Sequence, residues 1–102
     1  MEIYEIYQVE FRWGNCDDAR PWLIVQIRPG DIFGCLPIAS ECYGGSCFPI
    51  SRSHPDFPAT GLTKDCHIHD SKLYDIPKAN FLKRRGKLAG SLLAEFQDFS
   101  GL

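Results

Sequence analysis

No run of apolar residues in the sequence approaches the roughly 20 that a membrane-spanning helix needs, so we expect no membrane partner. The chain also lacks a strong excess of one charge, with a formal net charge of −2 at pH 7. A general nucleic-acid coat protein would be strongly basic, although a small net charge does not exclude a local basic patch. Residues 1–13 lack the basic segment, apolar core and cleavage site of a signal peptide, which predicts a cytoplasmic location.

The five cysteines include no Cys-x-x-Cys pair, and their number is odd. In a cytosolic chain this pattern favours reduced thiols over a disulfide framework. Cys42, Cys47, Cys66, His67 and His69 include the residue types that bind zinc, but their spacing matches no standard zinc finger. We therefore expect no metal and no cofactor.

Aromatic residues make up 13% of the chain, and nine glycines and seven prolines accompany them. Aromatic residues favour strands, whereas glycine and proline favour turns. A length of 102 residues, without internal repeats or linkers, predicts a single domain over residues 1–102.

The segment from Arg20 to Ser40 predicts a buried hairpin at the centre of the fold. Its first apolar run is 22–25, its turn is Pro29-Gly30, and its second apolar run is 32–38. A run that is apolar at every position indicates a strand covered on both faces. Pro21 is tolerated at the start of a strand, so Arg20 should lie where a loop becomes a strand, at the edge of a rigid scaffold.

The remaining pattern predicts a mainly β fold, a small and partly closed antiparallel barrel with a short helix and a C-terminal helix. Alternation over 3–11 predicts a first strand, with a bulge near Tyr4 or Tyr7. Further strands are expected over 47–50, 62–69 and 71–76. A short helix should begin at Pro77 and end at Gly86, and an amphipathic helix should cover 91–99 with Ser91 as its N-cap.

The order of three motifs resembles the PemK/MazF family, the toxins of bacterial type II toxin–antitoxin systems. The first motif is Arg20-Pro21 before the 22–25 strand, and the second is Leu-Pro-Ile-Ala-Ser at 36–40. The third motif comprises 60–66, 71–73, Ile76-Pro77 and Arg-Arg-Gly-Lys-Leu at 84–88. The resemblance implies an SH3-like barrel, a homodimer, and an mRNA interferase that cuts single-stranded RNA without metal. It also implies a cognate antitoxin that blocks the site.

Cleavage through the ribose 2′-OH requires a base, an acid and a cation that stabilises the charge on phosphorus. Arg20 matches the arginine of the family, and its planar guanidinium suits phosphate oxygens. The alternative is a surface arginine paired with Asp17 or Asp18. The threonine of the family falls on Ala39, and Ser40 can replace its hydroxyl only if a bulge turns it to the same face.

His67 and His69 alternate with Ile68 and should share one face of a strand. His69 falls where some members of the family carry a charged catalytic residue, so we predict that it is the acid or base. The alternative is that both histidines are exposed residues without a function.

Other candidates would contact RNA through stacking or charge. Trp13 could stack on a base or pack in the core, and the basic cluster around Arg84 and Arg85 could bind phosphate or simply face solvent. The RNA-binding candidates are Trp13, Asp18, His67, Ser71, Arg84 and Arg85.

Two other functions compete with the nuclease. One is a binding module for nucleic acid or protein that is silent because of Ala39. The other is a structural or metal-binding SH3-like module that uses Cys66, His67 and His69.

Overall fold

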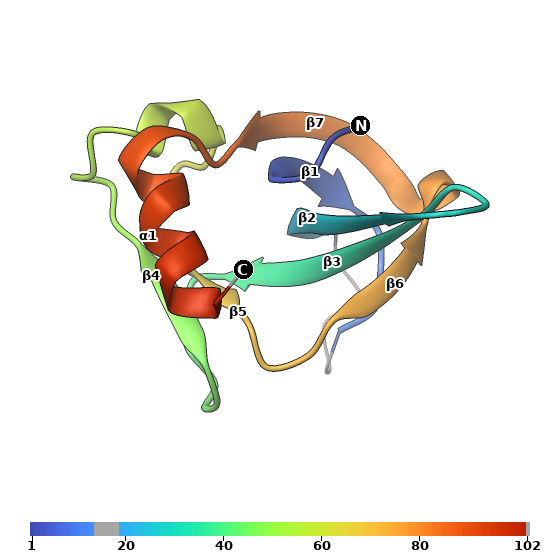
Figure 1. Cartoon of the computed structure of the whole chain (residues 1–102), viewed down its shortest axis with the longest axis horizontal. Coiled ribbons are helices and arrows are strands. Elements are labelled where there is room, and N and C mark those ends of the chain that lie inside the picture. The colour runs from blue at the N-terminus through green and yellow to red at the C-terminus, as the bar shows by residue number, and fades with distance from the viewer. Residues whose placement is uncertain (14–18, 102) are drawn as a thin grey trace.

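The computed structural model describes residues 1–13 and 19–101, and Figure 1 shows its mainly β architecture. The strands are β1 (Glu5–Val9), β2 (Arg20–Arg28), β3 (Ile32–Ala39), β4 (Cys47–Ile50), β5 (Cys66–His69), β6 (Tyr74–Pro77) and β7 (Phe81–Lys87). Two 3₁₀ turns, η1 (Phe57–Thr60) and η2 (Lys78–Asn80), and one helix, α1 (Gly90–Ser100), complete the described elements. None of these helices is long and apolar enough to cross a membrane.

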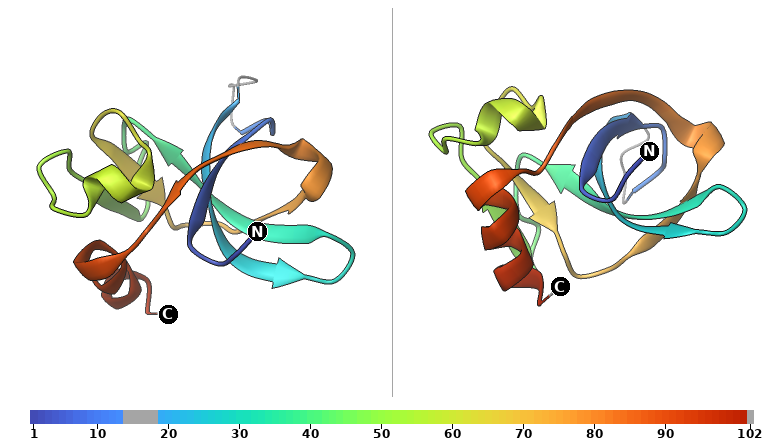
Figure 2. Two further views of the ribbon diagram at one scale, coloured as in Figure 1. Left: turned by 90° about the horizontal axis from the view of Figure 1, so that it is seen from above. Right: turned by 45° about the horizontal axis from the view of Figure 1, so that its top comes forward.

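The β2–β3 hairpin is confirmed, and it lies at the centre of the sheet. β3 pairs antiparallel with β2 along its length, with β6 through Ile32–Cys35, and with β5 through Ile38 and Ala39. The order β4-β5-β3-β2-β1-β7 follows, with β6 joined to β3 off this path. β1, β2, β3, β6 and β7 curl into a ring that remains open, because no described pairing joins β6 to β7 (Figure 2).

The two faces of the hairpin enter two hydrophobic cores, which explains why its apolar runs are continuous. On the inner face, inside the ring, Trp22 and Ile24 pack with Phe33 and Cys35. On the outer face, Leu23 packs with residues that include Leu36, Ile38, Phe48, Leu92 and Phe96. Since burying one such side chain contributes roughly 1.5–3 kcal/mol, every position of the run adds to the stability of one core or the other.

α1 covers the outer core beside β4 and β5 (Figure 1). Phe96 is fully buried, and its ring lies 5.4 Å from that of Phe48. The prediction of a C-terminal amphipathic helix is therefore confirmed, with one added residue at each end.

The expected helix from Pro77 to Gly86 is wrong. Pro77 ends β6, only η2 is helical, and 81–87 form the edge strand β7. β7 pairs with β1, placing Gly86 opposite Ile6 and Arg84 opposite Tyr7. This pairing supplies β1 with its second neighbour, so tertiary hydrogen bonding outweighs the local helix signals.

Three expected strands are confirmed with changed bounds. β1 lacks two residues at each end of the predicted 3–11, and β5 covers only the last part of 62–69. β6 begins after 71–73 and ends one residue later than predicted, at Pro77. The expected irregularity in the first strand is present, because the register between β1 and β7 shifts between Ile6 and Tyr7.

The N-terminus of α1 is capped from a distant loop. The expectation that Ser91 is its N-cap is therefore wrong. Ala89 holds the N-cap position and has no side-chain acceptor. The Oδ2 atom of Asp56 accepts hydrogen bonds from the Leu92 N–H at 3.2 Å and from the Ser91 hydroxyl at 2.9 Å. These bonds lower the pKa of the Asp56 carboxyl, and a negative charge at this end of the helix complements its dipole.

We predict that Asp56→Ala lowers the free energy of unfolding, because it removes the acceptor for two donors at the start of α1. Urea denaturation followed by circular dichroism measures this effect. Asp98→Ala, which removes a carboxylate from the opposite end of α1, is the matched control and should not lower the midpoint. Equal midpoints for the two variants would contradict the capping role.

Candidate functional site

Arg20 begins β2, and its guanidinium lies over the ring of Trp13. The distance from Arg20 Cζ to the Trp13 ring centroid is 5.0 Å, a cation–π geometry. Arg20 Nε is buried without a hydrogen-bond partner in the described chain. None of the ion pairs among the described residues includes Arg20, and Asp17 and Asp18, its expected surface partners, lie outside them. The charge of Arg20 is therefore not neutralised by any described carboxylate.

An aromatic cluster joins Arg20 to His69. The Trp13 ring lies 4.8 Å from the His69 ring, and the Tyr43 ring stacks on His69 at 5.6 Å. Only 5% of His69 is exposed, whereas 65% of Tyr43 is exposed. The alternative that both histidines are exposed is thus wrong for His69. Sequence reasoning missed Tyr43, because a tyrosine in a glycine-rich turn shows no sign of the distant ring that it contacts.

The tautomer of His69 follows from its hydrogen bond. His69 Nε2 lies 2.9 Å from the carbonyl oxygen of Glu41, which can only accept, so Nε2 carries the hydrogen in the neutral ring. Nδ1 is then a bare acceptor. It lies 3.7 Å from Cys47 Sγ, but this sulfur is in a disulfide and has no hydrogen to donate. The lone pair of Nδ1 is available to a proton.

Burial lowers the pKa of the His69 imidazole from its ordinary value of 6.5, because desolvation disfavours the charged ring. The hydrogen bond to Glu41 acts in the opposite direction, while the electrostatic influence of His67 and Arg20 lowers the pKa further. His69 is consequently neutral at neutral pH and able to accept a proton.

The expectation that the cysteines are reduced is wrong for Cys42 and Cys47, which form a disulfide. Gly44 and Gly45, with φ of 95° and 74°, turn the chain between them and bring their Cα atoms to 6.1 Å. A Gly-Gly turn between two cysteines is a local signal for a disulfide. The expectation of reduced thiols rested only on a cytosolic location and on cysteine spacing. Cys35 and Cys66 are free and buried, and burial raises the pKa of the Cys66 thiol to about 11.

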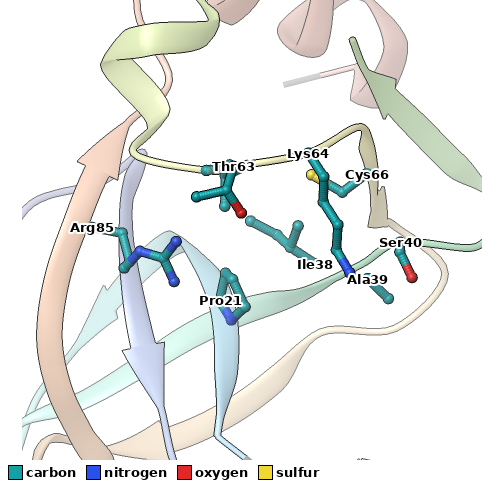
Figure 3. A pocket seen from close by; sticks show the side chains of 9 residues that line it. Pro21, Ile38, Ala39, Ser40, Thr63, Lys64, Cys66 and Arg85 are labelled. Atoms are coloured by element: carbon teal, nitrogen blue, oxygen red, sulfur yellow. The ribbon is translucent and has the colours of Figure 1, made fainter. Parts of the chain in front are cut away.

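Ser40 does not join Arg20. Ala39 pairs with His67 across the β3–β5 ladder and is the last residue of β3, so Ser40 lies just beyond the strand. Ser40 lines a cleft of about 170 Å³ beside the outer core (Figure 3), and Arg20 is not among the lining residues. The cleft is lined by Pro21, Ile38, Ala39, Ser40, Leu62, Thr63, Lys64, Cys66 and Arg85.

The other RNA-binding candidates fall in different places. His67 lies two residues from His69 on β5, and Arg85 lines the cleft. Arg84 is paired with Glu5 on β1. Ser71 lies beside Gly45 and lines a different cleft from the one that holds Arg85. Asp18 is outside the described residues.

The described residues do not support the metal-binding alternative. Among them, no three histidine, cysteine, aspartate or glutamate side chains converge in a way that could hold a metal ion. Cys66 and His69 lie on opposite sides of the sheet, because Cys66 lines the outer cleft while His69 belongs to the aromatic cluster with Trp13.

Comparison by sequence finds no matching protein-family model and no matching curated protein. Comparison by structure identifies a PemK/MazF-like toxin fold. The Mycobacterium tuberculosis toxin MazF-mt6 is similar with a TM-score of 0.71 and 19% identity, over 95% of this chain and 92% of that one. An endoribonuclease in complex with its cognate antitoxin, from a mycobacterial species, has a TM-score of 0.65 and 14% identity, over 94% of this chain and 84% of that one. At these identities the likeness establishes the fold.

We predict that Cys42→Ser with Cys47→Ser lowers the free energy of unfolding by about 2 kcal/mol, because the unfolded chain gains freedom. The loop holding Glu41 and Tyr43 should also loosen, so the pKa of His69 should rise toward its ordinary value as the ring becomes hydrated. Urea denaturation measures the first effect, and NMR titration of the imidazole measures the second. Wild-type protein in excess reductant should reproduce both, and two unchanged values would contradict the role of the disulfide.

Proposed function

We propose that this protein is an endoribonuclease toxin that cleaves single-stranded RNA in the cytoplasm without a metal ion. The observation that supports this most strongly is Arg20, a cation without a described carboxylate partner, held against Trp13 beside the neutral His69. A fold shared with MazF-like toxins agrees with the proposal.

In the proposed reaction, Nδ1 of His69 accepts the proton of a ribose 2′-OH, whose oxygen attacks the adjacent phosphorus. Arg20 donates hydrogen bonds to the phosphate oxygens as their negative charge grows. The bond to the 5′ oxygen then breaks, and that oxygen takes a proton from the imidazolium. The products are a 2′,3′-cyclic phosphate and a 5′-hydroxyl end.

Access to His69 requires the loop at 41–46 to move, because Tyr43 covers the imidazole. Tyr43 is held over the ring by stacking, and a nucleobase can form the same type of contact. We therefore propose that a base of the RNA replaces Tyr43 and stacks between Trp13 and the loop. Trp13 and His67 would then contact RNA, as the sequence predicts.

A second function, binding without cleavage, is favoured by Ala39. This residue is 7% exposed and lies on the same strand face as His67, so a donor is missing where the family carries a threonine. Ser40, the next hydroxyl along the chain, lies beyond the end of β3 and lines the outer cleft. A protein of this kind would bind RNA or a partner protein without cutting RNA.

We further propose a cognate antitoxin as partner and a homodimer as the working assembly. The antitoxin proposal is supported by the similar endoribonuclease, which is described in complex with its cognate antitoxin. The homodimer rests on the resemblance to the PemK/MazF family. Size-exclusion chromatography with light scattering tests it directly.

We predict that Arg20→Ala lowers the rate of RNA cleavage by about 10²–10³-fold, because the transition state loses its main cation. The assay maps cut ends on a long RNA in the presence of EDTA and tests them for 2′,3′-cyclic phosphate. Arg28→Ala, which removes the same charge from the far end of β2, should cleave like wild type. Intact RNA with both wild type and Arg28→Ala would favour the binding function.

We predict that kcat/KM rises with pH, through an apparent pKa below 6.5, to a plateau at neutral pH. The sign follows because the base must be unprotonated and its pKa is lowered by burial. His67→Gln removes an electrostatic influence that lowers the pKa of His69 and should move the rise to higher pH, whereas His69→Gln should abolish the rise. A rise unaffected by either substitution would exclude His69 as the base.

A further inference from the structure

We propose that the outer cleft is a second RNA subsite, which binds the phosphate and sugar of a nucleotide next to the cleaved one. This inference rests on the proposed function, because it assigns the cleft to the same RNA strand. Its volume of about 170 Å³ is smaller than the roughly 300–1,000 Å³ of pockets for drug-sized ligands. The cleft therefore suits part of one nucleotide.

Arg85 brings a positive charge to the cleft that no described carboxylate neutralises. Its Nη1 donates to Gln8 Oε1 at 2.8 Å, and its Nη2 donates to the Gly61 carbonyl at 2.9 Å. Both acceptors are neutral, and a guanidinium has five N–H donors, so donors and charge remain for an anion. The described ion pairs include neither Arg85 nor Lys64.

The position of Arg85 is fixed by close backbone contact between η1 and β7. A Cβ added to Gly61 would collide with the Arg85 carbonyl oxygen, and one added to Gly86 would collide with the Ala59 carbonyl oxygen. Gly61 also has a φ of 68°, in the region that favours glycine. Two glycines thus allow the backbones to touch, and the wall that holds Arg85 is rigid.

The rest of the lining fits a nucleotide. Lys64 extends toward Ala39 and Ser40, and the Thr63 side chain lies between Lys64 and Arg85 (Figure 3). These hydroxyls and cations can bind phosphate and ribose oxygens, while Pro21, Ile38 and Leu62 provide an apolar surface for the sugar.

The cleft is close enough to the Arg20 site for one RNA strand to reach both. Arg20 and Pro21 are consecutive residues at the start of β2, but their side chains face the inner and outer cores respectively. An RNA strand that crosses the end of β2 and β3 would place its scissile phosphate at Arg20 and the next nucleotide in the cleft. This continuity favours RNA over a free phosphate ion.

The test measures binding of a single-stranded 2′-O-methyl oligonucleotide, which cannot be cleaved through the 2′ position, by fluorescence anisotropy at several salt concentrations. Lys64→Ala removes an exposed side chain and should leave the fold intact. We expect weaker binding and a fall of about 1 in the slope of log affinity against log salt, because one phosphate contact is lost. Arg85→Lys keeps the charge but loses the planar guanidinium and should also weaken binding.

Lys78→Ala is the matched control, since Lys78 lies in η2 at the opposite end of the ring, where its N–H donates to Asp31. It should bind the oligonucleotide like wild type. If Lys64→Ala and Arg85→Lys both bind like Lys78→Ala, the subsite is refuted, even if Arg20-dependent cleavage is present. If binding depends on Lys64 while no RNA is cleaved, the subsite stands and the nuclease function fails.

Discussion

The antiparallel pairing of β2 with β3 is the interaction on which the rest of the structure depends. β3 also pairs with β5 and β6, so one strand joins the curled ring to the outer layer under α1. Alternate residues of the hairpin enter different cores, so side chains at the start of β2 and the end of β3 also point to two different sides. Arg20 and the aromatic cluster occupy one face there, and the cleft with Arg85 occupies the other.

Patterns that are both local and periodic allowed much of the fold to be predicted. The continuous apolar runs of β2 and β3 predicted a doubly covered hairpin, and the three- and four-residue spacing of Leu92 and Phe96 predicted α1. The helix expected after Pro77 failed because proline before the segment and cations before Gly86 imitate helix ends. The sequence of β7 contains little that distinguishes it from a helix, and its pairing with β1 decides its structure.

The candidate site was predictable only in part. The Arg20-Pro21 entry and the alternation of His67 with His69 predicted which residues share a face, and the structure brings Arg20, Trp13 and His69 together. Contacts between segments far apart in the chain could not be predicted. The cap that Asp56 provides for α1, the stacking of Tyr43 on His69, and the Gly61–Arg85 backbone contact all belong to this class.

The disulfide above His69 links the chemistry of the imidazole to the thiol status of the surroundings. When Cys42 and Cys47 are oxidised, no hydrogen on sulfur competes for the lone pair of Nδ1. A small-molecule thiol that reduces the bond frees the loop that carries Tyr43, so a reducing cell interior would uncover the imidazole ring.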